Sequence, residues 1–129
     1  MSTDRKTLAL EYLNAVGTHQ VRKLEALLAP DLQFRGPSRT LTSAAELVGA
    51  LKQLAAVHVR NDVKRVFVDG DEVCVIYDFV TDTAAGAVPT VEWLTIEGGR
   101  IRSIQLFYDR LPWGHVVEEL ARRASSAAA

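Results

Sequence analysis

The second half of the chain alternates between apolar and polar residues, with a period of two, from about Val59 to Asp109. Such alternation is typical of β-strands that bury one face. Asp69-Gly70-Asp71 and Glu97-Gly98-Gly99 each separate two β-branched runs, and glycine readily takes the positive φ of a tight hairpin turn. The pattern therefore predicts four consecutive antiparallel strands, at residues 63–68, 73–80, 88–96 and 101–108.

Helical spacing dominates the first half of the chain. Apolar residues recur at i, i+4 and i+7 or i+8 after Thr3 or Asp4, and either residue can cap a first helix that runs to about Val16. Ser43 and Glu46 have the spacing of a capping box, which marks the start of another helix. We expect helices at residues 4–16, 19–28, 43–57 and from 112 onward, with a short strand at 32–34.

The order of these elements indicates an α+β fold. Helices that precede a run of antiparallel strands commonly pack together on one face of the resulting sheet. At 129 residues the chain is long enough to bury a real core but fits a single domain, residues 1–129. No internal repeat or linker divides it.

Composition narrows the classes of partner and compartment. A net charge of −1 and a pI of about 6.3 argue against nucleic-acid binding, which requires a basic surface. A single cysteine excludes an internal disulfide and fits a reducing compartment, so we expect a cytoplasmic protein. The polar, charged start argues against a signal peptide, and no run of 18 apolar residues predicts a membrane span. The three histidines lack metal-ligand spacing, so we expect neither a metal nor a cofactor.

Two carboxylates lie within the predicted strands, where apolar residues would be expected. Asp78 and Glu92 are each surrounded by apolar and aromatic residues. A carboxyl on the covered face of a sheet loses water, which raises its pKa toward the range that is useful for proton transfer. On the open face the same group is merely solvated. The function therefore depends on which face each residue occupies.

Three short segments together resemble a known family. They are Val91–Ile101, with its Glu-Gly-Gly-Arg-Ile turn, the Phe107-Tyr108-Asp109 sequel, and Leu27–Leu32 before the first strand. In this order they resemble the SnoaL-like branch of the NTF2-like superfamily. The resemblance implies a cone-shaped barrel, in which a curved antiparallel sheet wraps around N-terminal helices and leaves an apolar pocket. It also implies a homodimer joined through the outer sheet face. The superfamily includes isomerases, cyclases, hydrolases and non-catalytic binding modules, so fold alone does not select a function.

The resemblance places parts of several catalytic sets in this chain. Tyr12 falls where the steroid isomerases keep a tyrosine that donates to the developing oxyanion, and Glu92 falls where they keep a second, protonated acid. Their general base would fall on Gly36, which has no side chain. The aspartate of the polyketide cyclases falls on Leu106. Asp78 matches one aspartate of the epoxide-hydrolase triad, without the arginine of that triad.

The face that Asp78 occupies is open to two interpretations. Simple alternation buries the odd-numbered set from Val73 to Phe79 and leaves Asp78 outside as a solvated rim carboxylate. The family register does the opposite, and we favour it because both faces of the strand are apolar. It gives a pocket lined by Tyr12, Val16, Leu51, Ile76, Asp78, Glu92, Leu94, Ile104, Leu106 and Tyr108. Phe79, Trp93 and Phe107 are then expected on the outer, dimer-forming face.

Two carboxyls in one dry cavity would titrate apart, so that one serves as acid and the other as base. We therefore expect a cofactor-independent acid–base enzyme of the isomerase, cyclase or epoxide-hydrolase type, acting on a small hydrophobic molecule. Glu92 and Asp78 would transfer protons, and Tyr12 would donate a hydrogen bond. The alternative is a non-catalytic small-molecule-binding or dimerisation module, in which the Glu92 carboxyl merely satisfies Tyr12.

Overall fold

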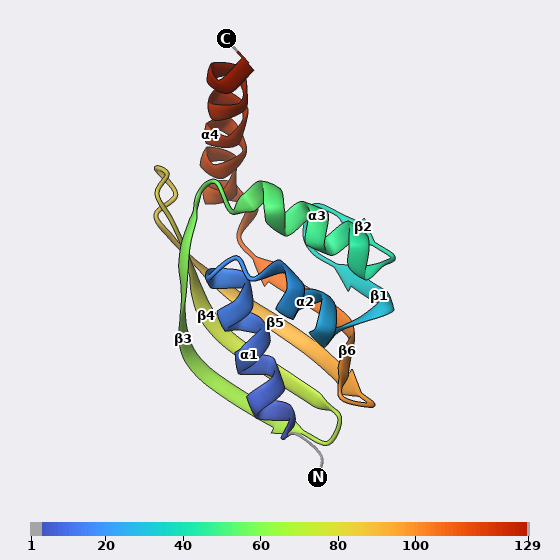
Figure 1. Ribbon diagram of the computed structural model, residues 1–129. Coiled ribbons are helices and arrows are strands. Elements are labelled where there is room, and N and C mark those ends of the chain that lie inside the picture. The colour runs from blue at the N-terminus through green and yellow to red at the C-terminus, as the bar shows by residue number, and fades with distance from the viewer. Residues whose placement is uncertain (1–3, 129) are drawn as a thin grey trace.

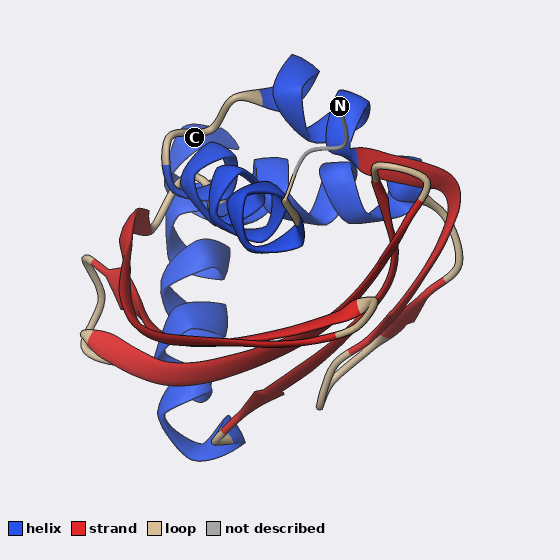
Figure 2. Ribbon diagram, turned by 90° about the horizontal axis from the view of Figure 1, so that it is seen from below, coloured by secondary structure: helices blue, strands red, loops and turns tan. Residues whose placement is uncertain are grey.

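One curved sheet of six strands holds three helices on its concave side, and a fourth helix follows the last strand (Figures 1 and 2). The computed structural model describes residues 4–128. The elements are, in order, α1 (Arg5–Gly17), α2 (Val21–Leu27), β1 (Leu28–Arg35), β2 (Thr40–Leu41), α3 (Ala44–Leu54), β3 (His58–Asp69), β4 (Glu72–Thr81), β5 (Ala87–Glu97), β6 (Arg100–Tyr108) and α4 (Arg110–Ala128). The four helices and the five strands expected from the sequence are all present, β2 was not expected, and the α+β class is confirmed.

The strands lie in the order β2-β1-β6-β5-β4-β3. Only β1 and β6 run parallel to each other, and every other neighbouring pair is antiparallel. The sheet bends sharply but stays open, so it does not close into a barrel (Figure 2). Register shifts interrupt β3 at two places, and others occur between β5 and β6 and between β1 and β6. Such bulges add an unpaired residue and bend the strand, which produces the curvature.

Local hydrogen bonds start the helices where the sequence indicates. The Asp4 carboxylate accepts from the backbone N–H of Lys6 at 3.2 Å and caps α1. The Ser43 hydroxyl accepts from the N–H of Glu46 at 3.1 Å and caps α3. The Glu46 carboxylate reaches back one residue further than a capping box requires, and accepts from the N–H of Thr42 at 3.2 Å. α3 is thereby fixed at the rim of the sheet.

The core lies between the concave face of the sheet and α1 and α2. Its largest fully buried side chains come from both layers: Tyr12, Leu13, Leu24, Leu28, Leu32, Leu94, Ile96, Ile101 and Ile104. At the edge, the Asn61 amide of β3 donates to the backbone carbonyl of Leu13 at 2.9 Å. The Nε2 atom of buried His58 lies 2.8 Å from Oδ1 of the same asparagine. This chain of contacts joins α1 to β3.

The face assignment that we favoured for β4 is wrong. Val73, Val75, Tyr77 and Phe79 are buried against the helices, whereas the even-numbered residues between them are half-buried or exposed on the outer side. Strict alternation along the strand decides the matter, because every second side chain must point the same way. The even-numbered residues of β4 include apolar side chains although they do not pack against the helices. Their apolar character therefore does not show that they face the pocket.

Among residues 4–128, no helix is long and apolar enough to cross a membrane.

His58 makes the stability of this edge dependent on pH. Its ring stacks on that of Phe79 with centroids 3.8 Å apart, and burial lowers its pKa from the usual 6.5. A base with a lowered pKa in the folded state binds protons more readily when unfolded, so stability is lost as pH falls below about 6.5. His58→Phe keeps a stacked ring that cannot titrate. In urea unfolding, we expect the free energy of unfolding of wild type to fall relative to that of this variant between pH 8 and pH 5.

The control is Leu111→Ala, which alters an 84% exposed residue of α4 that has no titratable group. The free energy of unfolding of this variant, relative to wild type, should not depend on pH over the same range. A His58→Phe difference that also stays constant would show that the ring does not titrate against folding.

Candidate active site

A cavity of about 370 Å³ lies between the concave face of the sheet and helices α1, α3 and α4. This volume is within the range of sites that bind small molecules. The wall is mostly apolar, with a few tyrosines and polar groups. It is lined by Tyr12, Val16, Phe34, Gly36, Ser38, Arg39, Leu41, Leu47, Ala50, Leu51, Gln53, Leu54, Tyr77, Phe79, Thr90, Glu92, Leu106, Tyr108, Trp113, Val117 and Leu120.

Glu92 presents the only acidic side chain among these lining residues. It lies in the middle of β5 on the inward-facing set, and only 4% of its surface is exposed. The strand register places Val75 of β4 on one side of it and Leu106 of β6 on the other. Glu92 is therefore held between apolar neighbours on a rigid strand, where water cannot surround its carboxyl.

The hydroxyl of Tyr77 donates to Oε2 of Glu92 at 2.8 Å, and both groups are buried. Tyr77 pairs directly with Thr90, so it lies diagonally across the strands from Glu92. A diagonal pair is within reach of an aromatic side chain. The Tyr12 hydroxyl of α1 also acts on the same carboxyl and lowers its pKa, with a smaller effect than that of Tyr77.

The environment places the Glu92 carboxyl near the midpoint of its titration at neutral pH. Burial raises its pKa from 4.5 to about 7, because the charged form loses its hydration. The hydroxyls of Tyr77 and, to a smaller extent, Tyr12 act in the opposite direction and keep the rise moderate. A carboxyl with a pKa of about 7 can both take up and release a proton at physiological pH.

The two tyrosines stay protonated throughout this range. Burial is the main cause that raises the pKa of both Tyr12 and Tyr77 well above 10, and the nearby charge of Glu92 raises it further. Both hydroxyls therefore act as hydrogen-bond donors, toward Glu92 or toward an oxygen atom of a ligand.

The structure brings together six of the ten residues expected to line the pocket. Tyr12, Val16, Leu51, Glu92, Leu106 and Tyr108 line the cavity. Leu94 and Ile104 point inward but are 0% and 2% exposed, so they belong to the packed core and do not line the cavity.

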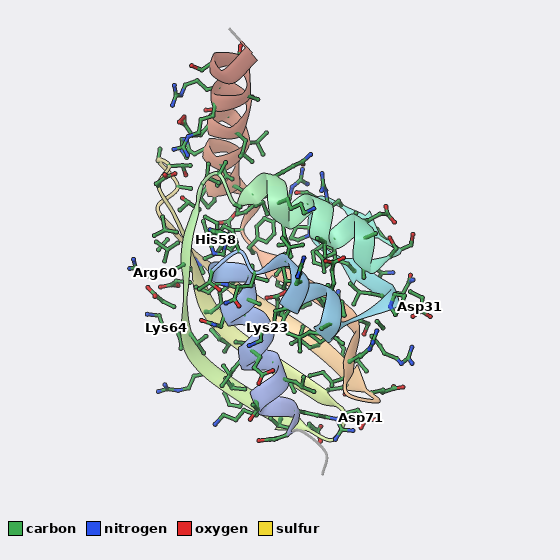
Figure 3. All side chains as sticks on the ribbon, viewed as in Figure 1. Lys23, Asp31, His58, Arg60, Lys64 and Asp71 are labelled. Atoms are coloured by element: carbon green, nitrogen blue, oxygen red, sulfur yellow. The ribbon has the colours of Figure 1, made fainter. Side chains whose placement is uncertain are left out.

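Ile76 and Asp78 lie on the outer face of β4. The family register had placed them in the pocket. The Asp78 carboxylate is half-buried and lies 3.5 Å from Nζ of Lys64 on the neighbouring strand. Figure 3 shows Lys64 on the side of β3 that faces away from the helices. The thickness of the sheet separates Asp78 from Glu92, so these carboxyls cannot divide the roles of acid and base in one cavity.

The wrong face assignment of β4 also placed two aromatic residues of the site on the outer face. Tyr77 and Phe79, which we expected on the outer face, are buried and line the cavity. Simple alternation along β4 would have found both. Trp113, Val117 and Leu120 belong to the helix expected from residue 112 onward, but no local pattern reveals that they form part of the cavity wall.

The mouth of the cavity differs from its interior. Arg39 is exposed in the turn that joins β1 to β2, where the backbone N–H of Gly36 donates to the Arg39 carbonyl at 2.9 Å. Ser38 and Gln53 add uncharged polar side chains to the lining, and the Tyr108 hydroxyl lies 3.5 Å from the Ser38 hydroxyl. Gly36 lines the cavity without a side chain, so no second acid occupies that position.

Within residues 4–128, no group of histidine, cysteine, aspartate and glutamate side chains is arranged to hold a metal ion.

Solved structures show the same fold. An NTF2-like protein of unknown function from Cytophaga hutchinsonii aligns with a TM-score of 0.76 at 20% identity, over 88% of this chain and 97% of that one. A Kribbella flavida protein named provisionally as a ketosteroid isomerase aligns with a TM-score of 0.72 at 20% identity, over 81% of this chain and 77% of that one. A Sinorhizobium meliloti protein named provisionally as a polyketide cyclase aligns with a TM-score of 0.72 at 16% identity, over 81% of this chain and 100% of that one.

None of the curated proteins matches this sequence. The family model of the SnoaL-like domain matches residues 9–104, which span α1 to the middle of β6 and contain both Glu92 and its tyrosines. The chain therefore belongs to the SnoaL-like family.

Proposed function

We propose that this protein is a cofactor-independent acid–base enzyme of the isomerase or cyclase type, acting on a small hydrophobic molecule. The observation that carries the proposal is the Glu92 carboxyl, which is buried in the wall of an apolar cavity and has a pKa of about 7. Perturbed carboxyls in cavities of this kind are candidates for proton transfer. The family fold supports the proposal in general terms, since relatives are named as isomerases and cyclases.

Because the cavity wall holds one carboxyl, the same group must first remove a proton from the ligand and then return it. The Glu92 carboxylate can remove a proton from the carbon next to a ligand carbonyl, so that the C–H electron pair moves into an enolate. The resulting acid then returns the proton to another carbon of the same molecule, and no co-reactant is consumed. Epoxide hydrolysis is less well served, because a second acid would have to protonate the leaving oxygen.

Tyr12 is suited to stabilise the enolate. While Glu92 is ionised, the Tyr77 hydroxyl donates a hydrogen bond to it, and the Tyr12 hydroxyl also stabilises its charge. When Glu92 takes up the proton, its negative charge disappears, and the Tyr77 hydroxyl alone satisfies it. The Tyr12 hydroxyl can then donate to the enolate oxygen, where the negative charge has moved. Such a donor stabilises the transition state more than the substrate.

A non-catalytic ligand-binding module is the second candidate, and a specific observation favours it. Among residues 4–128, every buried polar side-chain atom already has a hydrogen-bond partner. The Glu92–Tyr77 pair is thus complete without a ligand, and could serve to recognise a carbonyl or hydroxyl group without reacting.

The titration of Glu92 predicts a pH-dependent stability. Because the pKa rises on folding, ionisation of the folded protein is unfavourable, and stability falls as pH rises from about 4.5 through about 7. Glu92→Gln removes this loss. We expect the variant to gain stability over wild type, between pH 5 and pH 8, by up to about 3 kcal/mol in urea unfolding. His58 titrates in both proteins and cancels in the difference. A difference that is independent of pH would contradict the buried titration.

Turnover can be followed with a β,γ-unsaturated alicyclic ketone, whose conversion to the conjugated enone raises ultraviolet absorbance. We expect the rate to rise with pH through about 7, because the carboxylate is the base. Glu92→Gln should lower the rate by about 10²- to 10⁴-fold, and Tyr12→Phe by about 10²-fold. Asp78→Asn, on the outer face, is the matched control and should leave the rate unchanged.

Equal rates in wild type and Glu92→Gln would remove Glu92 from the mechanism. Binding of such ketones in the cavity without turnover, retained in Glu92→Gln, would instead support the binding module.

We also propose that the outer face of the sheet joins two copies of the chain. Phe67, Ile76, Trp93 and Phe107 are 36–57% exposed on this face. Neighbouring strands align them in two rows, with Phe67 and Trp93 both flanking Cys74, and Ile76 and Phe107 both flanking Val91. Monomers rarely leave such a contiguous apolar patch uncovered, and an identical patch on a second copy can cover it by two-fold symmetry.

Trp93→Lys tests this association. The indole N–H of Trp93 donates to the Glu72 carboxylate at 2.8 Å, and the new ammonium can form an ion pair with the same carboxylate, which preserves the strand. We expect wild type to sediment at twice the chain mass of 14.2 kDa and the variant at the chain mass itself. Leu111→Glu, at an 84% exposed position on α4, should remain a dimer. A monomeric wild type would contradict the proposal.

A further inference from the structure

We propose that the ligand of this cavity is an amphipathic carboxylate, and that Arg39 binds its charged end at the mouth. The inference deepens the proposed function and rests on the cavity assigned there. It starts from the charges of the wall: of all the lining residues, only Glu92 and Arg39 carry charged side chains. One is buried in the interior, and the other is exposed.

Arg39 has a free guanidinium, unlike several other arginines of the protein. Arg5, Arg60 and Arg102 each form ion pairs with aspartate or glutamate, and Arg123 bridges Asp82 and Glu119. Within residues 4–128, no carboxylate lies within ion-pair distance of Arg39. A guanidinium at a cavity mouth can therefore bind a ligand carboxylate, with which it can form two parallel hydrogen bonds.

The neighbouring groups at the mouth suit the same ligand. Ser38 and Gln53 both line the cavity and can donate hydrogen bonds to a carboxylate. The hairpin that carries Arg39 is anchored, because β1 pairs with β6 from Gln33 to Arg35. The hydrogen bond from the Gly36 N–H to the Arg39 carbonyl closes its turn. The cation is thus positioned by ordered backbone.

The two charges also determine the direction in which such a ligand enters. A carboxylate placed in the interior would lose its hydration and meet the Glu92 carboxyl, and both effects are unfavourable. At the mouth it keeps solvent and gains Arg39. The uncharged part of the ligand then lies between the apolar side chains of α3 and α4, with its reactive carbons next to Glu92.

A matched pair of probes tests the inference: 1-naphthaleneacetate and its neutral amide, 1-naphthaleneacetamide. The two have nearly the same shape and differ in charge. Both are titrated against the protein by displacement of N-phenyl-1-naphthylamine, which fluoresces in apolar cavities. In wild type at low ionic strength we expect the acetate to bind roughly three- to tenfold more tightly than the amide, as for an exposed charge-assisted pair. Added salt should reduce this preference.

Variants of two arginines show whether the preference for the acetate over the amide arises from Arg39. Arg39→Gln should abolish it and leave the amide affinity unchanged, and Arg39→Lys should restore part of it. Arg35→Gln removes a cation from the end of β1 that does not line the cavity, and should keep the full preference. Equal affinities for acetate and amide in wild type, or a preference that persists in Arg39→Gln, would overturn the inference.

The outcomes separate this inference from the proposed function. If Arg39 sets the preference but Glu92→Gln leaves turnover unchanged, the carboxylate site stands and the acid–base function fails. If the cavity binds both probes equally, only the carboxylate site fails. If no probe enters the cavity, the carboxylate site is overturned, and the turnover of the ketone alone decides the acid–base function. Leu51→Trp, which fills the cavity, should abolish the displacement signal and so show that binding occurs there.

Discussion

The site depends on one physical constraint: a carboxyl must be held without water on the concave face of the sheet. Removing the Glu92 carboxylate from solvent is unfavourable, and the Tyr77 hydroxyl at 2.8 Å returns only part of the lost hydration. Each partner comes from a different element, since Tyr77 lies on β4 and Tyr12 on α1. Burial on the sheet raises the pKa of Glu92, and the packing of α1, which carries Tyr12, adjusts it.

Curvature of the sheet creates the cavity and the exposed patch together. A bent sheet draws apart the side chains on its convex side and surrounds a hollow on its concave side. α1 and α2 fill one part of this hollow, whereas α3 lies toward the rim, and α4 projects away from the sheet (Figure 1). Three residues of α4, Trp113, Val117 and Leu120, line the cavity. The space between these helices stays open for a ligand.

The elements of the fold could be read from local sequence, because turn glycines, caps and periodicity act within a few residues. The inward position of Glu92 followed from the resemblance to the SnoaL-like family. Asp78 could not be placed with the same success, because both faces of β4 are apolar and alternation alone conflicts with the family register. Arg39 gave no local signal at all. Its place in the cavity wall depends on the turn before the two-residue strand β2 and on the distant helix α3, which meet only in the folded chain.

Glu92 is a poor choice for a residue whose only task is to pack. Leucine or methionine would fill a similar space between Val75 and Leu106 without any loss of hydration, and buried ionisable groups are often replaced by apolar ones with a gain in stability. The chain instead keeps an acid whose pKa has risen to about 7, next to an open cavity. Asp78 shows the contrast, because its carboxylate lies on the outer face of the sheet, is 27% exposed and is 3.5 Å from Nζ of Lys64. A destabilising group that faces an open cavity is best explained by what the cavity binds.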